Sequence, residues 1–125
     1  MARVDVEGWL GTLLGSRLSL PVASKPQATA TRFVVVKRTG GPAHLRMFDR
    51  PLVVVEAYGP TETKAIETLN AARDVLLSLR GIHNDVNVYS TSEVGGPGTL
   101  PDPLLPKLAR YTATYELHLI GLRAA

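Results

Sequence analysis

The sequence has no cysteine, which excludes a disulfide framework and thiolate metal sites. It also lacks any apolar run near the roughly 20 residues that cross a bilayer, so we expect no membrane partner. The first 18 residues place their apolar side chains at helical spacing rather than in the continuous block of a signal peptide, and we interpret them as part of the mature fold. These absences favour synthesis in a reducing cytoplasm.

Charge of one sign is also scarce, because 14 Lys and Arg residues stand against 11 Asp and Glu residues, for a net charge of +3. Most of the basic residues are arginines, and they are scattered along the chain instead of forming a basic block. This pattern argues against a dedicated, sequence-specific DNA-binding domain. Non-specific contact with phosphates stays open, because a few arginines from each copy would be multiplied in an oligomer.

Recognisable catalytic patterns are missing as well. His44, His83 and His118 lie far apart without metal-ligand spacing, and no serine sits in a G-x-S-x-G motif. The Gly-rich stretch 95–98 lacks the Lys-Ser/Thr ending of a phosphate-binding loop. Asp49 has no second carboxylate nearby in sequence, so we expect it to form an ion pair or an Asx turn rather than to act as an acid or base. The chain is therefore predicted to have no enzyme activity, no cofactor and no metal.

The patterns that are present describe one small domain. A length of 125 residues fits a single domain over 1–125 that buries about two thirds of its extended-chain surface. Strand and helix patterns follow one another in an order that predicts an α+β fold, with a mostly antiparallel sheet of about four to five strands packed against two α-helices.

The N-terminal part predicts a helix followed by an extended segment. Asp5 or a neighbour caps the helix, which runs to about Leu14 and ends at Gly15. Trp9 belongs to its apolar stripe and is expected in the core, with a subunit interface as the alternative. Residues 20–25 have prolines nearby and predict an extended connection or an edge strand.

The middle of the chain predicts a hairpin and a second helix. Residues 32–38 and 51–58 are rich in valine and predict two strands, the second of them central in the sheet. The turn signal Gly-Gly-Pro at 40–42 lies between them. A helix over 61–80 follows, with Gly81 expected as its left-handed C-cap.

The C-terminal part predicts two strands separated by a long loop. Residues 85–94 alternate like a half-exposed strand, with Val86, Val88 and Ser90 on one side. Residues 95–106 hold three glycines and four prolines and predict an irregular loop, which invites a functional explanation in so small a domain. Residues 108–122 predict a two-faced strand that is longer than the neighbouring helix can cover, so part of it is expected to pair with another subunit.

Several short motifs occur in an informative order. They are a Val-rich strand flanked by Arg, Asp49-Arg50-Pro51-Leu52-Val53, the helix 61–81, Leu100-Pro101-Asp102, and the ending ARYTATYEL at 109–117. In this order and over most of the chain the sequence resembles the tail-terminator proteins of long-tailed phages, the head-tail joining group. The resemblance implies a virion protein at the head-proximal end of the tail, synthesised in the host bacterial cytoplasm. Such a protein forms a ring of six that caps the tail tube, stops its polymerisation and offers a surface to the head-tail connector.

Two loops, 38–50 and 95–106, are predicted to contact neighbouring subunits or partners. The candidate interface residues are Trp9, Gly40, Gly41, Pro42, His44, Leu100, Pro101, Asp102 and Leu104. The candidates to line a lumen for passing DNA are Arg38, Arg46 and Arg50, and the alternative that each is solvated or pairs locally is equally open.

Two other functions stay open. A head-completion or connector protein would share the small size and the ring assembly. A small binding module would instead use a sheet face that carries Tyr89, Tyr111 and Tyr115 to stack a ligand or a single-stranded nucleic acid, although 6% aromatic residues is low for such a surface. Burial of these tyrosines under the helices would count against that module.

Overall fold

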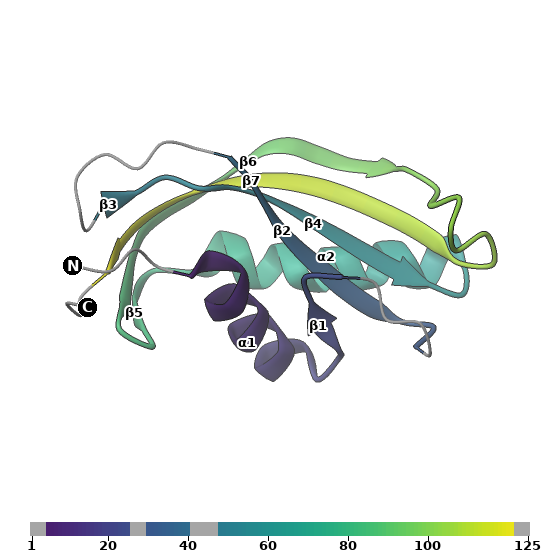
Figure 1. Cartoon of the computed structure of the whole chain (residues 1–125), viewed down its shortest axis with the longest axis horizontal. Helices are drawn as coiled ribbons and strands as arrows, with labels where there is room; N and C mark the ends of the chain where they lie inside the picture. Colours follow the sequence, from purple (N-terminus) through teal and green to yellow (C-terminus); the bar gives the residue numbers. More distant parts are fainter. Residues whose placement is uncertain (1–4, 26–29, 41–47, 122–125) are drawn as a thin grey trace.

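The computed structural model describes residues 5–25, 30–40 and 48–121. Two helices cover one face of a curved sheet (Figure 1), which confirms the α+β class. The elements are α1 (Val6–Leu18), β1 (Val22–Ala23), β2 (Phe33–Gly40), β3 (Phe48–Asp49), β4 (Leu52–Gly59), α2 (Glu62–Ser78), β5 (Gly81–His83), β6 (Val86–Thr99) and β7 (Ala109–Gly121). No helix in this part of the chain is long and apolar enough to span a membrane.

The sheet is larger than the sequence predicted. Within the described residues it has seven strands in the order β1-β2-β4-β7-β6-β5, with β3 paired to β7 beside this path. All neighbours are antiparallel except β1 and β2, which run parallel. The prediction of four to five strands was too low, because β1, β3 and β5 are only two or three residues long and carry no periodicity of their own.

Helix α1 is capped as predicted but is longer. The Asp5 side chain accepts a hydrogen bond from the backbone N–H of Gly8 at 3.2 Å, and Trp9 is buried on the apolar stripe. The predicted end at Gly15 was wrong: the helix continues to Leu18, and Ser19 takes the left-handed conformation, with its N–H bonded to the carbonyl of Gly15. A glycine inside a helix costs only about 1 kcal/mol relative to alanine, so Gly15 alone does not stop it.

The predicted hairpin is confirmed. Strands β2 and β4 pair antiparallel from Phe33 opposite Tyr58 to Gly40 opposite Leu52. Strand β1 lies parallel to β2 at the edge of the sheet, as the nearby prolines suggested. Strand β4 lies between β2 and β7, and this central position explains its nearly continuous apolar sequence.

Helix α2 begins as predicted and ends earlier. The hydroxyl of Thr61 accepts the N–H of Lys64 at 3.2 Å. The last helical residue is Ser78, and Leu79 follows as an extended C-cap, so the prediction of Gly81 as the cap was wrong. Gly81 does adopt a positive φ of 82°, but it uses this conformation, which favours glycine, to enter β5.

Strand β6 continues through half of the predicted 95–106 loop. Its pairing with β7 reaches Thr99, and the register shifts between Glu93 and Gly95 and between Gly95 and Gly98. These bulges accommodate Pro97, because a proline is tolerated at a bulge and β5 pairs only with residues 86–88 of β6, far from Pro97. A further shift between Val88 and Ser90 turns Thr91 inward in place of the predicted Ser90.

Strand β7 alternates as predicted but offers no free edge. Tyr115, Leu117 and Leu119 are buried on the helix side, whereas β4 and β3 pair with one edge of the strand and β6 with the other. The prediction that part of this strand pairs with another subunit was therefore wrong. The sheet and the two helices enclose the main core, and a second, small cluster of Phe33, Val35 and Tyr58 lies on the opposite face.

Candidate assembly surfaces

The segment 100–108 folds back over the sheet face that the helices leave uncovered. Leu105 and Leu108 pack against the small cluster that contains Phe33 and Tyr58. Within the segment the N–H of Leu105 bonds to the carbonyl of Asp102 at 3.0 Å, and the N–H of Leu108 bonds to the carbonyl of Leu105 at 3.1 Å. The segment is therefore a series of hydrogen-bonded turns rather than an open loop.

Arg110 on β7 fixes the start of this segment. Its Nε donates to the carbonyl of Leu100 at 2.5 Å, and an Nη donates to the carbonyl of Pro101 at 3.3 Å. The other Nη lies 2.9 Å from a carboxylate oxygen of Glu56 and 3.2 Å from the hydroxyl of Tyr58. One guanidinium group thus ties two loop carbonyls to two side chains of the central strand β4.

Asp102 fixes the middle of the segment from inside. It is only 9% exposed, and it accepts the hydroxyl of Tyr58 at 2.9 Å and the N–H of Leu104 at 3.0 Å. The Leu104 N–H is the main cause of a lowered pKa of the Asp102 carboxyl, with the Tyr58 hydroxyl and the charge of Arg110 acting in the same direction. Burial, followed by the hydrogen bond to Asp102, raises the pKa of Tyr58 to about 12. The pair is therefore a carboxylate and a neutral phenol at neutral pH.

The clamped segment exposes apolar side chains. Leu104 is 86% exposed and Leu100 is 54% exposed, while Pro101 between them is also exposed. Four candidate interface residues thus come together, but in two roles: Leu100, Pro101 and Leu104 face outward, and the buried Asp102 holds them in place.

The other predicted interface residues are spread over the molecule. Trp9 is 9% exposed, and its Nε1 donates to the carbonyl of His83 at 2.9 Å, so the core expectation for it is confirmed. Gly40 is exposed, with a φ of 142°. Gly41, Pro42 and His44 lie outside the described residues.

The two described lumen candidates make ion pairs. Arg38 holds Asp49 through two hydrogen bonds of 2.6 and 2.7 Å, and Asp49 is buried. Of the two roles expected for Asp49, an ion pair or an Asx turn, the ion pair is therefore confirmed, and its partner is Arg38. Arg50 lies 3.3 Å from Glu116, and Arg46 lies outside the described residues. In each pair the carboxylate offsets the positive charge of the guanidinium group, so the arginine attracts a DNA phosphate less strongly than an arginine outside an ion pair would.

The tyrosines do not form a common exposed face. Tyr115 is fully buried on the helix side, and Tyr111 packs against the same core. Tyr89 is 57% exposed and follows the inward-facing Val88 on β6. This arrangement counts against the stacking module.

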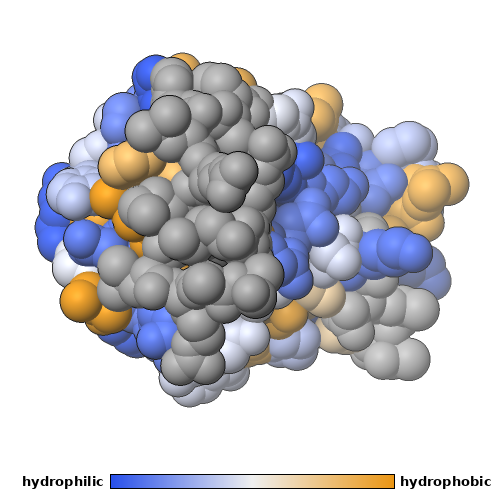
Figure 2. Space-filling view, turned by 60° about the vertical axis from the view of Figure 1, so that its left-hand side comes forward, coloured by the Kyte–Doolittle hydropathy of each residue, from blue (hydrophilic) through white to orange (hydrophobic). Residues whose placement is uncertain are grey.

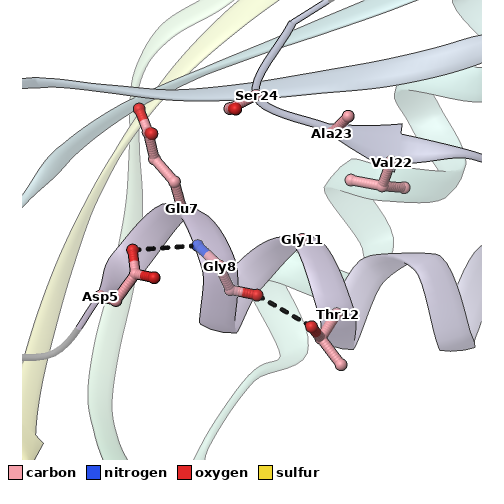
Figure 3. A pocket seen from close by; sticks show the side chains of 8 residues that line it. All are labelled: Asp5, Glu7, Gly8, Gly11, Thr12, Val22, Ala23 and Ser24. Carbon is pink, nitrogen blue, oxygen red and sulfur yellow. Dashed lines mark hydrogen bonds between the residues drawn. The ribbon is translucent and has the colours of Figure 1, made fainter. Parts of the chain in front are cut away.

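A hollow lies between α1 and β1 (Figure 3). Its volume is about 440 Å³, and its lining residues are Asp5, Glu7, Gly8, Gly11, Thr12, Val22, Ala23 and Ser24. Glu7 reaches from α1 to strand β2, where its carboxylate accepts the backbone N–H of Arg38 at 2.9 Å.

In Figure 2 the described surface at the end of the molecule turned forward is a mixture of hydrophilic areas and small hydrophobic patches.

The described residues contain no group of three or more His, Cys, Asp or Glu side chains that could hold a metal ion.

Comparison with known proteins gives a likeness of fold. No family model and no curated protein matches the sequence. Among solved structures, a chain from the "virion of native gene transfer agent (GTA) particle" superposes with a TM-score of 0.62 and 12% sequence identity. The match covers 87% of this chain and 85% of that chain. Nearly the whole domain thus shares its fold with a chain of a virion.

The contacts of Arg110 were not predicted from the sequence. Arg110, Glu56 and Tyr58 are 54 and 52 residues apart in sequence and become neighbours only through the register of β4 and β7. The available signal was the position of Arg110 on the polar face of the last strand, directly after a proline-rich segment.

Proposed function

We propose that this protein is a structural component of a phage-like particle and acts there as a tail terminator. In this role it would form a ring of six copies that caps the tail tube, stops its polymerisation and meets the head-tail connector. The observation that carries the proposal is the superposition over 87% of the chain on a chain of a gene transfer agent virion. The order of motifs in the sequence supports the more specific terminator role.

The surface is consistent with assembly rather than catalysis. The segment 100–108 holds Leu100 and Leu104 outward on a clamped backbone, and exposed apolar groups on a rigid support are typical of protein interfaces. The ion pairs of Arg38 and Arg50 favour only weak, salt-dependent contact with DNA if these residues line a lumen.

The mass of the purified protein in solution tests the proposal. Light scattering after size exclusion, over a concentration series and with or without tail-tube protein, should detect a species near six copies of the 13.4-kDa chain. A ring that forms alone, or only when tube protein is added, supports the tail terminator. A protein that stays monomeric at every concentration and ignores tube protein contradicts it.

A head-completion or connector protein is the second candidate, because a fold shared with a virion chain does not separate the two roles. The same experiment separates them when the purified connector or portal protein replaces the tube protein. Binding to tube protein favours the terminator, whereas binding only to the portal side favours the head-completion role.

A further inference from the structure

We propose that the ring closes through a contact between two different surfaces of the same chain. The projecting segment 100–108 of one copy docks in the hollow between α1 and β1 of the next copy, with Leu104 as the apolar anchor and Lys107 beside it. This inference rests on the proposed ring assembly and names the surfaces that make it.

The projecting segment is held by hydrogen bonds within its own chain. Arg110 holds the carbonyls of Leu100 and Pro101 at 2.5 and 3.3 Å, and the buried Asp102 holds the N–H of Leu104 at 3.0 Å. A segment that is already ordered loses little conformational entropy on binding, which favours affinity. Leu104 nevertheless points away from its own chain, at 86% exposed, so the clamp does not serve to bury this side chain.

The hollow complements the segment in charge and chemistry. Asp5 and Glu7 contribute carboxylates, and Val22 and Ala23 contribute apolar surface, as Figure 3 shows. The projecting segment carries groups that would match them. The exposed cation of Lys107 is opposite in charge to the carboxylates, and the exposed leucine is apolar like Val22 and Ala23. At about 440 Å³ the hollow lies within the range of roughly 300–1,000 Å³ that is usual for ligand pockets.

Among the described residues, the packing around Gly11 does not require a glycine. A Cβ atom added there would lie 3.9 Å from the Cγ1 of Val22, which is an ordinary van der Waals distance. The segment 100–108 lies at one end of the sheet, whereas α1 lies beneath the sheet and β1 is an edge strand beside α1 (Figure 1). A contact between such different surfaces is heterologous, and repeating it produces a ring when the rotation closes.

Engineered thiols test the contact, because the natural sequence has no cysteine to give a background. Leu104→Cys and Gly11→Cys are made as single variants and as one double variant, and each is treated with a short bismaleimide under ring-forming conditions. The double variant should give a covalent ladder up to the closed ring. An equimolar mixture of the two single variants should give covalent dimers and nothing larger, because each chain then carries one half of the contact.

The matched control replaces Gly11→Cys with Ile82→Cys, since Ile82 on β5 is 65% exposed and lies outside both surfaces. Leu104→Cys mixed with Ile82→Cys should give at least tenfold less dimer. Circular dichroism checks that every variant is folded. If rings form but Leu104→Cys cross-links to Gly11→Cys no more than to Ile82→Cys, the proposed contact is wrong although the ring assembly is supported. If the wild-type chain never forms a ring, the proposed function fails and the inference with it.

Discussion

Replacing Arg110 with methionine tests whether the clamp stabilises the domain. The change keeps much of the side-chain volume and removes the donors to Leu100, Pro101, Glu56 and Tyr58. It leaves the Glu56 carboxylate, whose side chain is 9% exposed, with Lys37 at 3.5 Å as its remaining salt-bridge partner in the described part of the chain.

The expected loss follows from the burial of this pair. Removing one partner of a buried ion pair costs about 3–5 kcal/mol. The Arg110 side chain keeps 13% exposure and Lys37 partly compensates, so we expect the lower end, about 3 kcal/mol. With a urea m-value of roughly 1.5–3 kcal/mol/M for a domain of this size, the unfolding midpoint should fall by about 1–2 M.

Urea unfolding followed by circular dichroism measures this shift. Arg17→Met, at an exposed position on α1, is the matched control and should move the midpoint by less than a quarter as much. Arg110→Lys should lie between the two, because an ammonium group can keep the charge pair with Glu56 but cannot also hold both carbonyls. If Arg110→Met is no more destabilising than Arg17→Met, the contacts of Arg110 do not stabilise the domain.

Two further predictions concern a close approach and the effect of acid. Gly59→Ala places a Cβ atom 2.7 Å from the backbone nitrogen of Ala65 and should lower the unfolding midpoint clearly, whereas Gly98→Ala, with nothing within 4 Å of its Cβ, should leave it nearly unchanged; thermal unfolding compares the two. The pKa of Asp102 is lowered in the folded protein, so its contribution is complete above its unfolded pKa and is lost as pH falls through the folded value. Stability measured from pH 7 down to about pH 2.5 should therefore fall on the acid side, and Asp102→Asn should flatten that fall; equal slopes for both chains would contradict the argument.

Local patterns predicted the parts of this fold that are repetitive. Valine-rich runs located β2 and β4, the 3.6-residue spacing located α1 and α2, and the alternation of β7 separated Tyr115 and Leu117 from the outer face. The starts of both helices could also be predicted, because the side chains of Asp5 and Thr61 accept hydrogen bonds from backbone N–H groups three residues further along the chain. Such features depend on neighbours in sequence, so the sequence alone specifies them.

Contacts between distant residues were decided by the tertiary structure. The extension of β6 through Pro97 depends on pairing with β7 and on the bulges between Glu93 and Gly98. Pairing of β4 with β7 brings Arg110 beside Glu56, and this ordered the segment that its prolines predicted to be irregular. The sequence thus determined the class of fold and the approximate place of each long element. Only the folded chain decided which polar groups meet, because ion pairs and hydrogen bonds require distances of a few ångströms that sequence separation does not encode.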